Sequence, residues 1–169
     1  LTDGVFVSSW SLFRDRLLWL REILLKIKKI NNVNWLVKSH PNDEIKKVVT
    51  TTDSEYEKFC SNCNHIKMFP NNITMSSIPR FIDVAISFKS PASEYSCFGI
   101  PAITACESNC TGLGYTIDPR SKEEYFFQLQ NVKKLKKLNN QQIESAKIFI
   151  FTQIILTQIP SNLIIHHST

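Results

Sequence analysis

The stretch Glu94-Tyr95-Ser96-Cys97-Phe98-Gly99-Ile100-Pro101 decides the fold of this chain. Its pattern predicts a short helix with a carboxylate in the first turn, a glycine that ends the helix, and a proline that leads into a buried strand over 102–105. Another apolar strand, 83–88, precedes it. In such a strand–helix–strand unit, the start of the helix lies at the carboxyl edge of a parallel sheet, where open α/β sheets bind ligands. The sequence therefore predicts a carboxylate, Glu94, at that edge.

Working outward from this unit, short apolar runs alternate with longer segments of helical periodicity. The predicted strands span 4–8, 33–38, 65–69, 83–88, 102–105 and 115–117. The predicted helices span 12–30, 44–49, a segment capped by Asp53 or Ser54 and ending at Cys60, 76–81, 92–98, a helix opened by the capping box 121–124, and 141–159. The alternation predicts an α/β fold with a doubly wound, mostly parallel, Rossmann-like sheet.

Composition narrows the class of protein and of ligand. The chain has 169 residues, of which 43% are hydrophobic and 21% charged, as expected of one globular domain. Lys and Arg number 20 against 15 Asp and Glu, which gives a net charge of +5. This balance suits an anionic ligand or an anionic membrane surface. We expect no nucleic-acid partner, because no basic–aromatic motif of a nucleic-acid module is present.

The cysteines are interpreted as reduced thiols rather than as metal ligands. The residue types of a zinc site occur in two cysteine pairs. The first is Cys60-x-x-Cys63 with His65 nearby, and the second is the wider pair Cys106 and Cys110. The second pair has three intervening residues and is separated from the first by predicted strands. With Cys97 the total of five is odd, and we expect no metal and a cytoplasmic, reducing location.

A histidine follows the predicted strand 33–38. Proline at 41 bars His40 from helical geometry and places it in a turn at the strand end. An imidazole at that place can donate to a phosphate as a neutral group or as a cation near neutral pH. The alternative is a turn histidine that hydrogen-bonds its own loop.

Hydroxyls and lysines follow the other predicted strands. Ser90 and Ser93 precede or open the helix that carries Glu94, where an anion would meet hydroxyls and backbone N–H groups. Lys38 and Lys89 directly follow predicted strands and can pair with phosphate. Ser8 and Ser9 end the first predicted strand.

The ordered set of His40-Pro41, the loop 89–93 leading to Glu94, and Gly99-Ile100-Pro101 resembles the C-terminal, donor-binding half of GT-B-type glycosyltransferases. Within them it is similar to the bacterial group that makes capsular and surface polysaccharides. The resemblance covers about 5–159. It implies that Glu94 accepts hydrogen bonds from the ribose of a nucleotide-sugar.

The same resemblance implies that His40 is catalytic and stabilises charge on the leaving nucleotide. It also implies a set of further donor contacts, mostly to phosphate: Ser8, Ser9, Lys38, Lys89, Ser90 and Ser93. The chain departs from the family where a glycine usually begins the loop, since it has Lys89-Ser90-Pro91. Proline removes one backbone donor, while lysine adds a positive charge.

From this resemblance we expect a glycosyltransferase fragment that lacks its N-terminal acceptor domain. Residues 1–139 would bind the nucleotide-sugar, 140–159 would form a closing helix packed on this domain or on the missing one, and 160–169 would be a tail. No cofactor is expected, since the nucleotide-sugar is the substrate, and the acceptor would be a glycan or a lipid-linked sugar. The closing helix is apolar and lies beside the basic connector 133–137, which allows peripheral contact with the inner face of a membrane. The simpler interpretation is that the same helix packs on the protein and the connector is a solvated linker.

Two alternatives stay open at this point. One is a non-catalytic, degenerate module that binds a sugar-nucleotide or a partner without turnover. The other is a sugar-nucleotide epimerase of the same fold, which would need further acid and base carboxylates around the sugar.

Overall fold

The chain was analysed as a computed structural model, which describes residues 9–39, 50–70, 72–89 and 92–157. Its strands form two small parallel sheets. In the first, β1 (Trp35–Val37) pairs with β2 (Ile66–Met68). In the second, β3 (Ala85–Ser87), β4 (Ala102–Thr104) and β5 (Thr116–Ile117) lie in the order β3-β4-β5. The protein is therefore α/β, as the alternation of the sequence predicts.

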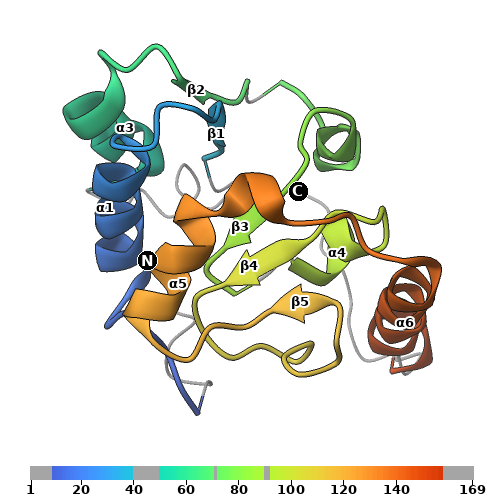
Figure 1. The fold of residues 1–169 in the computed structure, drawn as a ribbon. Helices are drawn as coiled ribbons and strands as arrows, with labels where there is room; N and C mark the ends of the chain where they lie inside the picture. Colours follow the sequence, from blue (N-terminus) through green and yellow to red (C-terminus); the bar gives the residue numbers. More distant parts are fainter. Residues whose placement is uncertain (1–8, 40–49, 71, 90–91, 158–169) are drawn as a thin grey trace, which may run out of the picture.

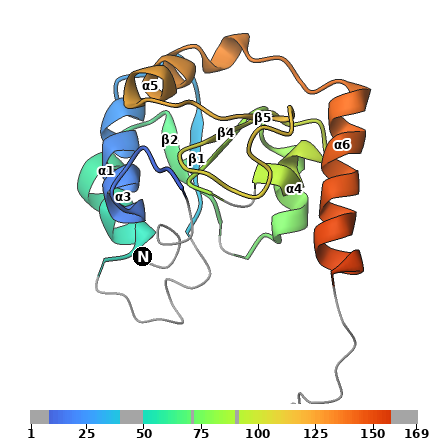
Figure 2. The same cartoon turned by 90° about the horizontal axis from the view of Figure 1, so that it is seen from below.

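Helices flank the sheets on both sides (Figures 1 and 2). The helices in chain order are α1 (Arg16–Ile27), α3 (Thr52–Cys60), the 3-10 helix η2 (Met75–Arg80), α4 (Ala92–Ser96), α5 (Lys122–Gln130), the 3-10 helix η3 (Val132–Lys134), α6 (Asn140–Phe151) and the π-helix η4 (Thr152–Leu156). Helices α1 and α3 lie together at one side, and α4 and α6 lie together at the other. Within the described part of the chain, none of these helices has the length and apolarity that a bilayer span requires.

Two predicted helix starts are wrong, and hydrogen bonding explains both. Helix α1 begins at Arg16 rather than at residue 12, because the N–H of Leu12 donates to the carbonyl of Ala105 and Asp15 caps the helix. Helix α3 is capped by Thr51 rather than by Asp53 or Ser54. The Thr51 and Ser54 side chains each accept from the other's backbone N–H, at 3.1 and 3.0 Å.

Other predicted elements agree with the structure, although most are longer than the observed ones. The α-helical part of the last helix ends at Phe151, and the π-helix η4 continues to Leu156, whereas the prediction ran to 159. The predicted strand 4–8, the predicted helix 44–49 and the predicted tail lie outside the described residues.

The larger core lies between the first sheet, α1, α3 and α5. It joins residues of both sheets and these helices, among them Leu24, Trp35, Ile66, Ile103 and Tyr125. A smaller core lies between α4, the start of β5 and α6, where Ala92, Tyr115 and Ala146 are buried. Burial alternates along β1, where Trp35 is buried and Leu36 is exposed.

Gly99 connects α4 to the smaller core. It has a φ of +77°, a conformation that favours glycine, and its N–H donates to the carbonyl of Ser96 at 3.0 Å. Its own carbonyl accepts from the N–H of Leu138 at 2.9 Å. This bond ties the end of α4 to the segment that leads into α6.

Candidate functional site

The carboxyl ends of β3, β4 and β5 meet at one edge because these strands are parallel. Lys89 follows β3, Glu107 follows β4, and Arg120 follows β5. The segment 9–12 lies against the same edge. Its Trp10 carbonyl accepts from the N–H of Glu107 at 3.1 Å, and Ser11 forms an antiparallel bridge with Cys106.

We call Ser9, Trp10, Lys89, Glu107 and Arg120 the carboxyl-edge cluster. The N–H of Ser9 donates to Oε2 of Glu107 at 2.5 Å. The guanidinium of Arg120 lies over the indole of Trp10, 4.5 Å from the ring centroid. Hydrogen bonds from Ser9 lower the pKa of Glu107, and the charges of Arg120 and Lys89 lower it further. The lowered pKa favours the ionised form of the Glu107 carboxylate.

Helix α4 follows β3 in the chain, so its first turn begins at the same carboxyl edge. Glu94 is exposed and Ser93 is half-buried. Burial raises the pKa of the Cys110 thiol, and hydrogen bonds with Ser108 and with the Ser93 backbone oppose that shift. Cys110 lies in the loop after β4 and Ser93 in the first turn of α4, so the loop and the start of the helix are in contact. The buried Ser96 hydroxyl donates to the carbonyls of Ala92 and Tyr115, at 3.1 and 3.3 Å. These bonds hold α4 with Glu94 facing solvent.

Lys38 belongs to the other sheet. Its ammonium lies 5.3 Å from the centroid of the Phe69 ring, which follows β2. Ser39, the next residue, donates to Asp53 of α3 at 2.5 Å. Lys38 therefore follows a strand of the first sheet, whereas Ser9, Lys89 and Ser93 lie at the carboxyl edge of the second sheet. Ser8, His40 and Ser90 lie outside the described residues.

Sequence reasoning missed Trp10 and Arg120 as a pair, and assigned no role to Glu107. The available signal was that each follows a predicted strand. Asp118, another carboxylate at a strand end, has a structural role. It accepts from the hydroxyls of Thr104 and Thr116, at 2.7 and 2.9 Å, and from the N–H of Gly112 at 3.0 Å, and so fixes the loop between β4 and β5.

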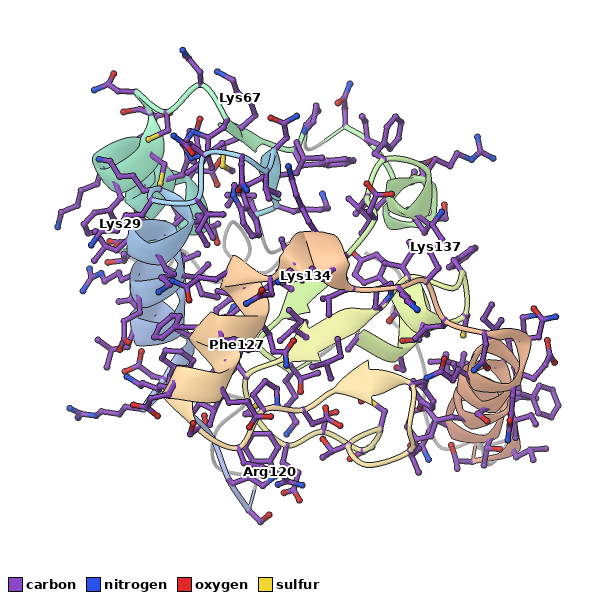
Figure 3. The ribbon with its side chains drawn as sticks, in the orientation of Figure 1. Lys29, Lys67, Arg120, Phe127, Lys134 and Lys137 are labelled. Atoms are coloured by element: carbon purple, nitrogen blue, oxygen red, sulfur yellow. The ribbon has the colours of Figure 1, made fainter. Side chains whose placement is uncertain are left out.

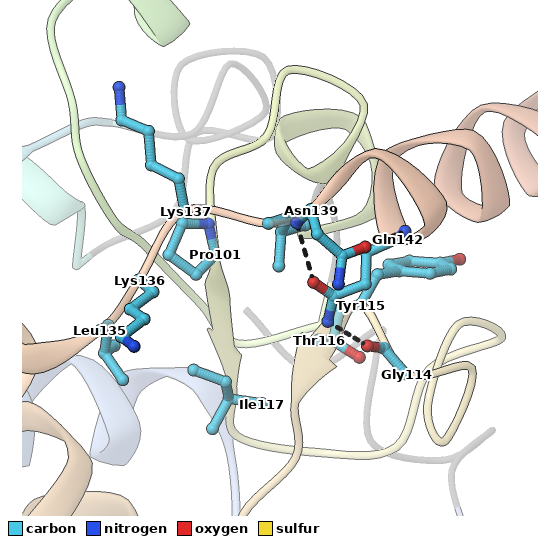
Figure 4. Close-up of a pocket in the computed structure, with 11 residues that line it drawn as sticks. Pro101, Gly114, Tyr115, Thr116, Ile117, Leu135, Lys136, Lys137, Asn139 and Gln142 are labelled. Carbon is cyan, nitrogen blue, oxygen red and sulfur yellow. Dashed lines mark hydrogen bonds between the residues drawn. The ribbon is translucent and has the colours of Figure 1, made fainter.

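A hollow of about 400 Å³ lies elsewhere, beside the amino ends of β4 and β5 (Figure 4). It is bounded by the segment 135–139 and by α6. The Gln142 side chain at its rim donates to the carbonyl of Gly114 at 2.8 Å and accepts from the N–H of Asn139 at 3.0 Å. With that amide already bonded, the charged groups that line the hollow are Lys136 and Lys137. It has no carboxylate for a ribose, so we do not assign the donor to it.

The predicted basic connector and the outer face of α6 are both exposed. Lys133, Lys134, Lys136 and Lys137 are all exposed, and Lys134 and Lys137 are labelled in Figure 3. On α6 and η4, exposed apolar side chains recur at helical spacing at Ile148, Phe151 and Ile155. The opposite face of α6 is packed, with Ala146 buried. An apolar strip therefore stays exposed on the outer side of this helix.

The cysteines bear on the zinc alternative. His65 directs Nε2 at the carbonyl of Ile27, 3.2 Å away, and burial raises the pKa of Cys60 to about 11. Within residues 9–39, 50–70, 72–89 and 92–157, no three His, Cys, Asp or Glu side chains are grouped as metal ligands.

Comparisons of the chain with protein-family models, with curated proteins and with solved structures find no match. Function is therefore argued from the carboxyl-edge cluster and from the residues that the sequence places beside it.

Proposed function

We propose that the chain is the donor-binding domain of a GT-B-type glycosyltransferase that transfers a sugar from a nucleotide donor during synthesis of a surface or capsular polysaccharide. One observation carries the proposal. Ser9, Lys89 and the first turn of α4 with Glu94 lie at the carboxyl edge of one parallel sheet. That edge is where open α/β sheets bind nucleotides.

We also propose that the two small sheets are halves of one doubly wound, Rossmann-like sheet. The larger core already joins Trp35 and Ile66 of the first sheet to Ile103 of the second. The predicted strand 4–8 directly precedes the segment 9–12, which lies at the carboxyl end of β4.

In this proposal the chemistry is binding and charge neutralisation. Glu94 would accept hydrogen bonds from the ribose, and Lys89 with Ser9, Ser93 and the predicted Ser8 and Ser90 would bind phosphate. His40 would stabilise the leaving nucleotide, with Lys38 as a second cation. A glycan or lipid-linked acceptor would be held by another domain, at the cytoplasmic face of a membrane.

Calorimetric titration with CMP, CDP, UDP and GDP tests the proposal. We expect selective binding of one nucleotide, and a loss of about tenfold to a hundredfold in affinity for Glu94→Gln, since hydrogen bonds to a charged group contribute about 1.5–3 kcal/mol. Glu57→Gln is the matched control, because Glu57 is equally exposed on α3, away from the edge. Nucleotide binding that is unchanged by Glu94→Gln would contradict the role of Glu94, and a folded chain that binds no nucleotide would contradict the proposal.

A second candidate is a non-catalytic module of the same fold. Two observations favour it, namely Lys89-Ser90-Pro91 in place of a glycine-led loop and the exposed apolar face of α6. Such a module would bind the nucleotide with the same dependence on Glu94 and would not turn it over. Incubation of the chain with the proposed acceptor domain, the preferred nucleotide-sugar and an acceptor separates the two candidates, since only the enzyme releases free nucleotide.

A further inference from the structure

Arg120 is held at the carboxyl edge before any ligand arrives. Its backbone N–H donates to Oε2 of Glu124 at 2.8 Å, and it follows the buried Pro119. Its side chain is exposed and its guanidinium lies on the Trp10 indole. An arginine restrained in this way loses less conformational freedom when it binds an oxyanion through two N–H groups. It lies at the lower rim of the molecule in Figure 3.

The cluster around Arg120 carries a net positive charge. Lys89, Glu107 and Arg120 follow β3, β4 and β5 at one edge of the sheet, and the charges of both cations lower the pKa of Glu107. Hydrogen bonds from Ser9 occupy that carboxylate, and within the described part of the chain Arg120 forms no ion pair that would neutralise its guanidinium. Counted over its own residues alone, the carboxyl-edge cluster therefore holds two cations, Lys89 and Arg120, against one carboxylate, Glu107.

Trp10 supplies an independent observation. Its indole Nε1 is buried and has no hydrogen-bond partner among the described residues. A buried donor without an acceptor is uncommon and calls for an explanation. An oxyanion bound at the cluster would bring an acceptor next to this ring, beside the guanidinium that covers it.

The spacing of the cations favours a long anion. Lys89 follows β3 and Arg120 follows β5, with β4 between them. Neighbouring strands are about 4.8 Å apart, so these two chain positions are separated by roughly 10 Å across the edge. A diphosphate spans more of that gap than a single phosphate does.

We propose that Arg120, positioned by Trp10, binds the second phosphate of the donor, so that the site takes nucleoside diphosphate sugars in preference to nucleoside monophosphate sugars. The inference rests on the proposed function, in which Glu94 holds the ribose and Lys89 the first phosphate. It names Arg120 as a substrate-binding residue and Glu107 as a positioning residue between the two cations.

The test compares CDP with CMP, and UDP with UMP, by calorimetry on the full chain and on Arg120→Ala. We expect the wild type to bind the diphosphates about tenfold to a hundredfold more tightly than the monophosphates, and Arg120→Ala to remove this preference while leaving monophosphate affinity within about twofold. Arg120→Lys should restore part of the preference, since it keeps the charge but loses the two-pronged geometry. Arg80→Ala, at an exposed arginine of η2, is the matched control.

The outcomes separate this inference from the proposed function. An equal loss for monophosphates and diphosphates, no loss at all, or a wild type that prefers monophosphates would overturn the role of Arg120 while nucleotide binding stands. If no nucleotide binds, the proposed function fails, and titration with inorganic pyrophosphate decides the inference alone. Pyrophosphate binding that is lost in Arg120→Ala and kept in Arg80→Ala supports the anion site, and absence of pyrophosphate binding overturns it.

Discussion

Replacement of Gly99 by alanine tests how α4 is fixed against α6. Gly99 has a φ of +77°, and a Cβ added there would lie 3.2 Å from Cδ1 of Ile143 on α6. Gly112 offers a matched control, because its φ is +79° and an added Cβ would have no atom within 4 Å. The two substitutions share the backbone cost and differ in the contact.

The structure sets the expected magnitudes. The left-handed conformation costs an alanine about 1–2 kcal/mol, and the loss of glycine freedom in the unfolded chain returns about 0.4–1 kcal/mol. Gly112→Ala should therefore lower the free energy of unfolding by about 1 kcal/mol. At Gly99 the Ile143 side chain must also shift from its rotamer, which costs about 0.5–1.5 kcal/mol more. The total for Gly99→Ala is about 1.5–2.5 kcal/mol.

Urea unfolding followed by circular dichroism measures both values, provided that the slope with urea is unchanged. A double-mutant cycle with Ile143→Val isolates the contact, since valine lacks Cδ1. In that background Gly99→Ala should cost no more than Gly112→Ala. Equal costs for the two glycines in the wild-type background would refute the described approach of α4 to α6, and a negligible cost at Gly112 would refute the backbone argument.

Three further perturbations probe the core, the ion pairs and the surface. Tyr125→Phe removes a buried hydroxyl that accepts an indole N–H at 2.9 Å, and it should lower the free energy of unfolding by about 1 kcal/mol. Tyr115→Phe removes a buried hydroxyl with no partner among the described residues, and it should not lower this free energy. Urea titrations that give the reverse order would contradict this expectation. The hydrogen bond from Arg21 lowers the pKa of Glu55, so this pair stabilises the fold above the ordinary carboxyl pKa of about 4.5 and is lost as the pH falls further. Glu55→Gln should then reduce stability at neutral pH and flatten its decline in acid, and an unchanged acid profile would count against the pair. Phe151→Ser, at a side chain that is 53% exposed, should leave the melting temperature nearly unchanged and reduce the binding of a hydrophobic dye.

The sequence predicted the strands well because their burial is determined locally. Short apolar runs such as the one around Ile103 are too brief for helices and are bounded by proline or polar residues. The start of α1 was mispredicted because Leu12 and Phe13 fit the helical period, while a tertiary hydrogen bond from Leu12 to Ala105 takes the segment out of the helix. Asp15, whose side chain accepts from the N–H of Leu18 at 2.8 Å, was the local signal for the true start.

The candidate site was predictable only in part, because it too depends on tertiary contacts. Lys89 and Glu94 could be assigned to the carboxyl edge because each follows a predicted strand. The contact between Trp10 and Arg120 joins residues 110 positions apart, and no periodicity or spacing of the sequence reports it. The order of strands brings them together, and that order emerges only when the elements are packed.

The spacing from Glu94 to Gly99 follows from the dimensions of the sheet. A strand of three residues, such as β4, spans about 10 Å, and the helix that returns along it rises about 1.5 Å per residue. Helix α4 ends at Ser96, so its four steps from Ala92 cover about 6 Å, and the turn 97–99 completes the return along the strand. Gly99 then lies at the amino end of β4 and bonds to Leu138, while Glu94 stands in the first turn of α4, toward the opposite edge. A residue inserted between them would turn the carboxylate by about 100° around the helix, so the same spacing that closes the smaller core also aims the group on which the proposed donor site depends.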